Sequence, residues 1–516
     1  MCIRDRFRAV LFALIILTIA TDAVYAQVNG CGEISANAGG KVDRHILKSD
    51  FEFVIEEFVR ASELLPGVAI GIVSENEVVF SQGFGFRDLS NCAPVTPDTR
   101  FYLKSATKSF SGMVAAILHE EDSINLDAPI TKYLPRISLK APINADQISL
   151  ADHFTHTQPY RAGGLNYRTA YPANLNEEDF VSHLNEFGTP RDISFRYSNE
   201  GPIIAMYAIG VHVGSTWRDL IQERIFNPIQ MPNSFTSMTE AERGEIAKSY
   251  YLMGSGVFNL TKTKTDRQFH AAGGVVSTVN DLNRWLMINL AGGRLGDEQV
   301  IARRAIEHSH ARIVHLNARF LEFDRFAHGL GLYSADYEGD VLMHHFGGET
   351  HVSFMPEHKF GVVILTNAIS NGVVVSHRLA ASIYDLLLGK SDADQKLARR
   401  LEEIGSWIQE SELRRAEYLA ELESHSSSGR ASLAMHDLAG TYTEPRLGSI
   451  VITVDGNEAI GRFGEINISI RHIGGDFYTA DFGIWGDPPE LFQIARDDSG
   501  RVVLDWGGRL FIGHSG

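Results

Sequence analysis

The sequence predicts an α/β chain of the α+β type, with an antiparallel sheet flanked by helices, an inserted helical lobe and a small C-terminal β-barrel domain. Two β-rich runs surround a polar turn at residues 74–77, and strand patterns return at 351–354 and 360–367. From 105 to 290, apolar residues recur mostly at helical spacing. Short β-patterned runs separated by turn signals then fill residues 437–516. We therefore expect strands from both ends of the main domain to share one sheet.

Length and charge limit the classes of protein that fit. The chain has 516 residues with 44% hydrophobic content, enough to bury a large core in two or three domains. Its 47 Lys and Arg against 64 Asp and Glu give a net charge of −17. Because such a field repels phosphate backbones, nucleic acid is not an expected partner.

The N-terminus has the features of a secretory signal peptide over residues 1–26. Arginines at positions 4, 6 and 8 precede an apolar run over 9–20 and a small-residue ending at Ala26. A membrane anchor is the alternative, but the apolar run is too short to span a bilayer comfortably. We expect cleavage after Ala26, a periplasmic or secreted protein, and no stable membrane span once the signal is removed.

Composition divides the remaining chain into three segments. Residues 27–390 carry the sheet and the helical lobe, residues 391–432 form a charged helical segment with a Ser-rich linker, and residues 433–516 form the C-terminal β domain. After signal cleavage two cysteines remain, Cys31 and Cys92. An oxidising compartment permits a bridge between them, and two unrelated free thiols are the alternative.

Ser105 stands three residues before Lys108, at the start of an apolar helical pattern. One interpretation makes Ser105 a helix cap and Lys108 a surface residue. Lysine is unfavourable there, however, because the N-terminus of a helix already carries partial positive charge. Burial, the helix dipole and the neighbouring Lys104 are expected to lower the pKa of the Lys108 amine. Since residues i and i+3 share a helix face, Lys108 is then a candidate base and Ser105 a candidate nucleophile.

Two further motifs lie downstream. Tyr197-Ser198-Asn199 sits on a loop before a helical pattern, and His345-Phe346-Gly347-Gly348 precedes a strand pattern. Taken singly, the first is explained as a turn and the second as a Gly-rich strand entry with a satisfied histidine. Neither establishes a site by itself.

Together, the three motifs in this order resemble the serine β-lactamase and penicillin-binding-protein superfamily. The closest resemblance is to its class C-like serine hydrolases, which include esterases and D-aminopeptidases and carry Ser-x-x-Lys, Tyr-x-Asn and Lys-Thr-Gly or His-x-Gly. Stretches such as "LPGVAIGIV", "AAGGVVSTVNDLNRWL" and "FGVVILTN" extend the resemblance in register over residues 65–367. It implies a β-lactamase-like serine hydrolase domain over 27–390, and residues 433–516 resemble a lipocalin-like appendage.

The resemblance implies acyl transfer to a serine and then to water. It assigns the nucleophile to Ser105, the general base to Lys108 and proton transfer to the leaving group to Tyr197. Backbone N–H groups of Ser105 and Gly348 are expected to form the oxyanion hole. The implied substrate-binding residues are Asn199, His345, Gly347 and Gly348. No metal and no organic cofactor are expected, and the expected partner is a small-molecule or peptide substrate.

The sequence also departs from the family pattern. His345 stands where β-lactamases usually carry lysine, so a cation that holds a substrate carboxylate is weakened or made pH-dependent. Gln158-Pro159 replaces the usual Ser-Gly, and Glu349-Thr350-His351 replaces a Thr-Pro-Gly-like turn. Both changes are expected on loops beside the cleft.

We therefore expect an exported serine hydrolase of the esterase or D-amino-acid peptidase type. A β-lactamase or penicillin-binding DD-carboxypeptidase is one alternative. A non-catalytic protein that binds cell-wall fragments on the same fold is an alternative of a different class. The natural substrate and the oligomeric state stay open at this stage.

Overall fold

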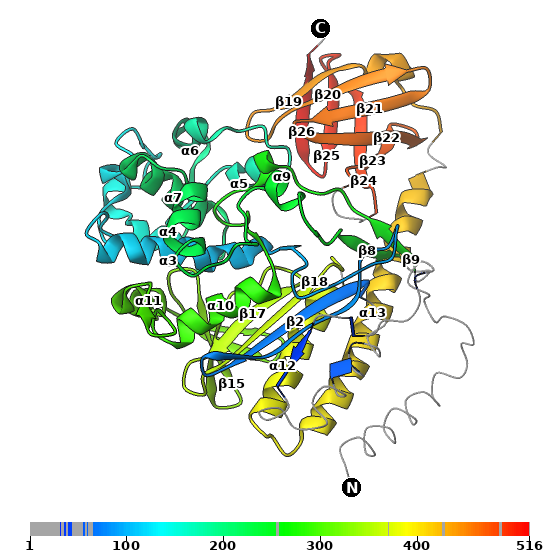
Figure 1. Ribbon diagram of the computed structural model, residues 1–516. Coiled ribbons are helices and arrows are strands. Elements are labelled where there is room, and N and C mark those ends of the chain that lie inside the picture. Colours follow the sequence, from blue (N-terminus) through cyan, green and yellow to red (C-terminus); the bar gives the residue numbers. More distant parts are fainter. Residues whose placement is uncertain are drawn as a thin grey trace.

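Figure 1 shows the computed structural model, which describes Cys31, residues 36–37, 40–43, 55–56 and 59, and residues 65–514 apart from 254–256, 370, 426–428 and 484–487. The expected signal peptide over 1–26 lies outside the described residues, as does most of a helical pattern at 51–64. Within the described ranges, every helix is too short or too polar to cross a bilayer.

The main sheet has ten strands, all pairing antiparallel in the order β1-β3-β2-β18-β17-β16-β15-β14-β13, with β4 paired to β3. As predicted, a strand that opens the domain lies beside one that closes it, because β2 pairs with β18. The bounds are β1 (Lys41–Val42), β2 (Gly67–Ser74), β3 (Glu77–Asp88), β4 (Ala93–Pro94), β13 (Val314–Phe320), β14 (Phe323–His328), β15 (Tyr333–Tyr337), β16 (Asp340–His344), β17 (Thr350–Met355) and β18 (Phe360–Thr366).

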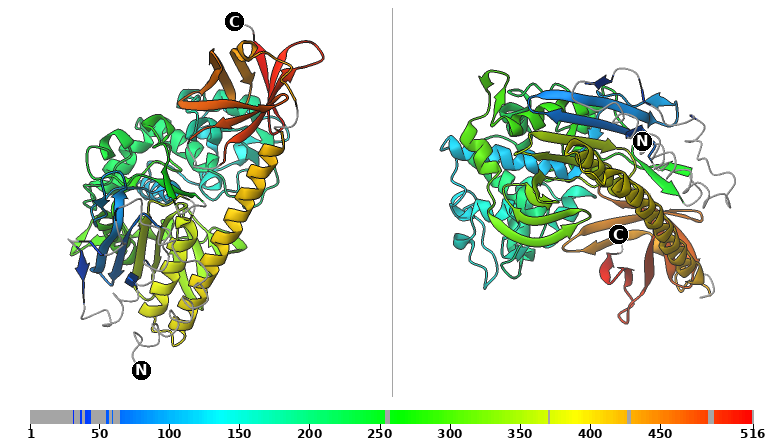
Figure 2. Two further views of the ribbon diagram at one scale, coloured as in Figure 1. Left: turned by 90° about the vertical axis from the view of Figure 1, so that its right-hand side faces the viewer. Right: turned by 90° about the horizontal axis from the view of Figure 1, so that it is seen from below.

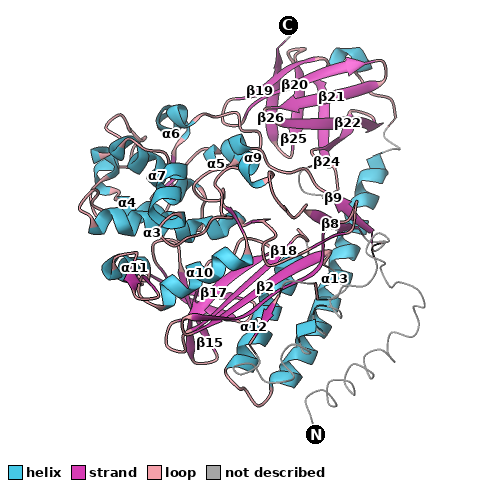
Figure 3. Ribbon diagram, viewed as in Figure 1, coloured by secondary structure: helices cyan, strands magenta, loops and turns pink. Residues whose placement is uncertain are grey.

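Helices cover both faces of this sheet, as Figure 3 shows. Every residue of β2 is buried because alternate side chains enter two different cores. Ala69 and Val73 pack in the core that contains α10 (Val279–Leu290), whereas Ile70 packs with α12 (Gly372–Leu387). Thr278 caps the start of α10, since its side chain accepts the backbone N–H of Asp281.

The helical lobe is built around α3 (Thr107–Glu120), whose residues 107–118 are all buried. A helix that is buried all round is a core helix, so the side chains on its first turn are held away from water. The other helices of the lobe and its edge are α4 (Leu150–Phe154), α5 (Leu165–Ala170), α6 (Phe180–Phe187), α7 (Glu200–Val213), α8 (Trp217–Ile221), α9 (Met238–Ala241) and α11 (Arg303–Ser309). Short strand pairs join them: β5 (Phe101–Tyr102) with β10 (Val276–Ser277), β6 (Tyr160–Arg161) with β7 (Thr189–Pro190), β8 (Tyr250–Met253) with β9 (Val257–Leu260), and β11 (Arg294–Leu295) with β12 (Glu298–Gln299).

A closed barrel of eight strands forms the C-terminal domain, in agreement with the predicted fold class. Its strands alternate buried and exposed residues, as β21 does most regularly. Tyr167 and Tyr171 of the helical lobe pack against the barrel core. The strands are β19 (Gly440–Glu444), β20 (Gly448–Asp455), β21 (Glu458–Phe463), β22 (Ile466–Gly474), β23 (Phe477–Asp481), β24 (Glu490–Arg496), β25 (Val502–Trp506) and β26 (Arg509–His514).

One long helix, α13 (Ala393–Ser424), leads from the main sheet to the barrel along one side of the molecule (Figure 2). Arg400 anchors its first half: the guanidinium lies 2.6 Å from Asp385 of α12 and 2.9 Å from the Tyr337 hydroxyl. The Arg400 and Asp385 side chains are 1% and 0% exposed. A buried pair of this kind is sensitive to the loss of either partner.

The structure resolves the question of the cysteines. Cys31 and Cys92 form a disulfide that closes a sequence separation of 61 residues. The bridge attaches the segment before the main sheet to the loop next to β4.

We expect Arg400→Ala to lower the free energy of unfolding by about 3 kcal/mol, because the buried Asp385 loses its closest cation and keeps only the more distant Lys396, at 3.7 Å. The matched control is Arg399→Ala, one residue earlier, whose side chain is 60% exposed and which should change stability by only about 0.5 kcal/mol. Urea denaturation of the full chain measures both. Equal losses in the two variants would show that the buried network does not anchor α13.

Candidate active site

Ser105 lies in a single 3₁₀ turn, Lys104–Ala106, immediately before α3. It is therefore not the cap of α3, whose N-cap position is Ala106. The preceding residue, Lys104, has a φ of 50°, a left-handed conformation that is uncommon for a residue with a side chain. The Leu103 N–H bonds the Val275 carbonyl at 2.8 Å and helps to hold this turn. Strained backbone of this kind concentrates at functional sites.

The Lys108 amine is fully buried and has three contacts within hydrogen-bonding distance. Its Nζ lies 3.1 Å from Ser105 Oγ, 2.6 Å from Asn199 Oδ1 and 2.9 Å from the Ala272 carbonyl oxygen. Burial lowers the pKa of Lys108 well below its usual value, and the charge of Glu200 opposes this shift only in part. The Lys104 charge, which we expected to contribute, is instead paired with Glu349 at 2.7 Å.

The three contacts of Lys108 have different chemical characters. Asn199 Oδ1 and the Ala272 carbonyl can only accept hydrogen bonds, whereas the Ser105 hydroxyl can also donate one. A neutral amine has two N–H donors and one lone pair. With both donors used on the two obligate acceptors, the lone pair is directed at the Ser105 hydroxyl.

Tyr197 and Asn199 approach from the loop that precedes α7. The Tyr197 ring centroid lies 4.8 Å from Lys108 Nζ. Tyr197 is 41% exposed as a whole residue, but its hydroxyl lies in desolvated surroundings. This desolvation raises the pKa of the Tyr197 hydroxyl above the usual value, and a hydrogen bond with Ser105 lowers it in part. Three side chains of the predicted site are thus gathered around the Ser105 hydroxyl.

His345, Gly347 and Gly348 lie in the connection from β16 to β17, opposite that loop. The His345 ring centroid is 6.1 Å from that of Tyr197. Its Nδ1 donates to the Phe346 carbonyl at 2.9 Å, and its Nε2 has no hydrogen-bond partner in the described part of the chain. Burial, reinforced by the Lys108 amine, lowers the pKa of His345 well below its usual value. His345 is therefore a neutral imidazole at neutral pH and not a cation.

Gly347 and Gly348 each require glycine, for different geometric reasons. A Cβ on Gly347 would stand 1.8 Å from the Leu103 carbonyl oxygen, so only glycine allows this close approach to the segment that leads into Ser105. Gly348 has a φ of 63°, in the left-handed region that favours glycine. That Gly348 and Ser105 form an oxyanion hole stays a prediction.

Two of the departures from the family pattern, at Gln158 and at Glu349, contact residues within or next to the predicted motifs. Gln158 donates from Nε2 to Ser198 Oγ at 2.9 Å, between Tyr197 and Asn199 in sequence. Glu349 is buried and pairs with Lys104, the residue before Ser105. Burial raises the pKa of Glu349, and the charge of Lys104 opposes that rise. The Gln158 loop and the turn at Glu349 therefore adjoin the site, as expected, whereas Thr350 and His351 lie on strand β17 and not on a loop.

Some groups at the site were not predicted from the sequence. The Ala272 carbonyl binds Lys108, and no side-chain pattern signals a backbone acceptor. His156, whose ring centroid lies 4.9 Å from that of Tyr197, comes two residues before Gln158 and was given no role from the sequence. Arg325 of β14 lies in a segment whose strands the sequence analysis did not assign. Among the described residues, no group of three or more His, Cys, Asp or Glu side chains is arranged to hold a metal ion.

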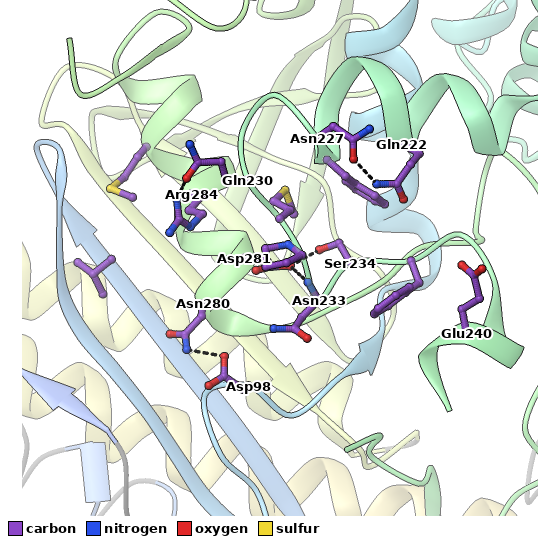
Figure 4. Close-up of a pocket in the computed structure, with 16 residues that line it drawn as sticks. Asp98, Gln222, Asn227, Gln230, Asn233, Ser234, Glu240, Asn280, Asp281 and Arg284 are labelled. Carbon is purple, nitrogen blue, oxygen red and sulfur yellow. Dashed lines mark hydrogen bonds between the residues drawn. The ribbon is translucent and has the colours of Figure 1, made fainter. Parts of the chain in front are cut away.

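A polar pocket of about 770 Å³ opens elsewhere on the molecule, beside α10 (Figure 4). Its lining mixes amide and acidic side chains with apolar ones and Arg284, and Asp281 accepts there from the Ser234 hydroxyl at 2.8 Å. Neither Ser105 nor Lys108 lines it. This pocket is thus separate from the candidate active site.

Comparison with known proteins places this geometry in a family. The Beta-lactamase family model matches residues 54–382. An unguisins hydrolase from Aspergillus violaceofuscus is 22% identical over 85% of this chain and 84% of its own. A teichoic acid D-alanine hydrolase from Staphylococcus aureus is 22% identical over 42% of this chain, and the alignment spans about half (52%) of that protein's length.

A solved structure shares the fold over nearly the whole chain. The octameric penicillin-binding protein homologue from Pyrococcus abyssi has a TM-score of 0.58 at 21% identity, over 90% of this chain and 99% of that one. This likeness concerns the fold alone. With the family match extending over most of the chain, the protein belongs to the beta-lactamase family of serine hydrolases.

Proposed function

We propose that this protein is an exported hydrolase that cleaves an ester or an amide through a covalent acyl-enzyme on Ser105. The observation that carries the proposal is the position of the buried Lys108 amine, which lies 3.1 Å from Ser105 Oγ. Its two other contacts are oxygens that can only accept hydrogen bonds. A nucleophilic serine needs a base within hydrogen-bond reach whose pKa lies near the working pH. Burial supplies that lowered pKa here.

The reaction follows from the positions of these groups. Lys108 takes the proton of Ser105 as Oγ attacks the substrate carbonyl carbon, and backbone N–H groups of Ser105 and Gly348 stabilise the developing oxyanion. Collapse of the tetrahedral intermediate breaks the bond to the leaving group, and the proton passes to that group through the Tyr197 hydroxyl. A water molecule then attacks the acyl-enzyme, and its proton passes through the Tyr197 hydroxyl to the Lys108 amine. As the second tetrahedral intermediate releases the acid product, Ser105 Oγ takes this proton back from Lys108.

The substrate class we favour is an acyl ester or a D-amino-acid derivative. A relative named as a hydrolase of D-alanine on teichoic acid supports this class. A β-lactamase or DD-carboxypeptidase is the second candidate, favoured by the family match itself. It differs from the β-lactamase pattern at the third motif, where the neutral His345 supplies no cation of its own for a substrate carboxylate.

We also propose that the protein is exported to the periplasm or secreted. The N-terminal charge and hydropathy pattern supports export, and so does the Cys31–Cys92 disulfide, because disulfides persist in oxidising compartments. A non-catalytic protein that binds cell-wall fragments is the alternative of a different class. Formation of an acyl-enzyme separates the two.

Ser105→Ala is expected to abolish labelling by a fluorophosphonate probe and to lower ester turnover by several orders of magnitude, because among the described residues Ser105 carries the only hydroxyl that contacts the Lys108 amine. The control is Ser109→Ala in the first turn of α3, where the Ser109 hydroxyl instead donates to the Ala106 carbonyl, and this variant should still be labelled. Intact mass spectrometry measures the label, and a panel of p-nitrophenyl esters, D-alanyl peptides and penicillin identifies the acyl donor. Stoichiometric labelling of the Ser105→Ala protein would refute the proposal.

The rate should depend on pH through Lys108. The neutral amine is the reactive form, so kcat/KM rises as pH rises through the Lys108 pKa, and burial puts this limb well below pH 10.5. Lys108→Met is expected to reduce kcat/KM roughly 10²- to 10⁴-fold and to remove that limb from the residual activity. A limb that appears only near pH 10 and above, or one that survives in Lys108→Met, would contradict the assignment of the base.

A further inference from the structure

Arg325 of β14 is a half-buried cation without an acidic partner among the described residues. The neighbouring acids are engaged elsewhere: Glu322 pairs with Arg378 and Arg400, and Asp324 with Arg319. Charged side chains removed from water are normally paired, so an unpaired guanidinium inside the fold calls for an explanation.

Aromatic rings compensate this charge only in part. The Arg325 Cζ lies 4.1 Å from the Tyr333 ring centroid and 4.6 Å from that of Phe320. Its Nε donates to His344 Nε2 at 3.3 Å. A guanidinium has five N–H donors in a fixed fork that matches a carboxylate, and in the described part of the chain only Nε has a hydrogen-bond partner. The end of the fork is therefore available to an anion.

A series of neighbouring aromatic rings connects Arg325 with the candidate active site. The Tyr333 ring centroid lies 5.8 Å from that of His345, which is 6.1 Å from that of Tyr197. The charge of Arg325 also acts on the Tyr197 hydroxyl and on His345, although burial is the larger cause of the pKa shift of each. The guanidinium is thus near the groups that handle the substrate in the proposed reaction.

Among the described residues around Arg325, the nearby histidines and lysines carry no free positive charge. Arg191 is a permanent cation in the same region that acts on His156, but its Nε and one terminal N–H group already donate to the Gln158 and His156 carbonyls. Burial lowers the pKa of His156, His328 and His345 well below neutral pH, so these imidazoles are uncharged. Lys108 is similarly shifted toward its neutral form, and Lys104 is paired with Glu349. Arginine keeps its charge in such an environment.

We infer that Arg325 binds a carboxylate carried by the substrate and so makes the enzyme selective for anionic esters or amides. This inference rests on the proposed function, since it specifies the substrate of the same site. Arg325 acts as a specificity-determining residue and takes no part in proton transfer. It supplies, from β14, the positive charge that His345 does not supply from the third motif.

The test compares charged and uncharged substrates of matched shape. One arm places the carboxylate on the acyl group, with mono-4-nitrophenyl glutarate against 4-nitrophenyl butyrate. The other arm places it on the leaving group, with 3-carboxyphenyl butyrate against phenyl butyrate. The enzymes are the wild type, Arg325→Gln, Arg325→Lys and the control Arg319→Gln, which removes an exposed charge from the adjacent strand β13.

In one of the two arms, the wild type should prefer the charged ester in kcat/KM. Arg325→Gln should reduce that preference roughly tenfold or more, because a charge-assisted, bidentate contact is lost. Arg325→Lys should retain part of the preference, since it keeps the charge without the fork. Arg319→Gln should leave the preference unchanged. A preference that Arg325→Gln leaves unaltered in both arms would mean that Arg325 serves packing alone.

Binding measurements test the role of Arg325 independently of the proposed reaction. The Ser105→Ala protein does not form the acyl-enzyme, so calorimetry can compare its affinity for the charged and uncharged esters with that of Ser105→Ala/Arg325→Gln. Weaker binding of the charged ester alone in the double variant supports the role of Arg325. Equal affinities in the two proteins overturn it, whereas failure of wild-type Ser105 to react with fluorophosphonate overturns the proposed function instead.

Discussion

The contact between the buried Lys108 amine and the Ser105 hydroxyl is the interaction on which the rest of the site depends. Three parts of the chain converge to make it: the start of α3, the loop before α7 that carries Asn199, and the Ala272 segment. Burial within the helical lobe favours the neutral amine. The two fixed acceptors then orient its lone pair. Burial in the large core thus sets the protonation state of the Lys108 amine, and the fixed acceptors set its orientation.

Much of the fold and of the site could be predicted because the signals are local or collinear. The hairpin patterns and the helical spacing around α3 predicted the shared sheet and a helix at this place, and these were confirmed. The spacing of Ser105 and Lys108 reflects one helical turn. The boundaries at residues 390 and 432 stay predictions.

The remainder depends on contacts between distant segments, which no local pattern encodes. The sequence analysis did not assign β13 and β14, which carry many exposed polar residues and lack the continuous apolar runs of the central strands. The Ala272 carbonyl has no side-chain signature. The packing of Tyr167 against the barrel core and the pairing of Lys104 with Glu349 required the assembled fold. The latter removed Lys104 from the expected causes of the low Lys108 pKa and left burial as the main one.

The protonation state of Lys108 tests the central claim most directly. Protein labelled with ¹³C at the lysine side-chain ε-carbon gives one NMR signal per lysine, and the Lys108→Met spectrum identifies the signal of Lys108. Our account predicts that this signal titrates well below pH 10.5, in the Ser105→Ala protein as well as in the wild type. A Lys108 signal that titrates near pH 10.5, like the exposed lysines, would contradict it.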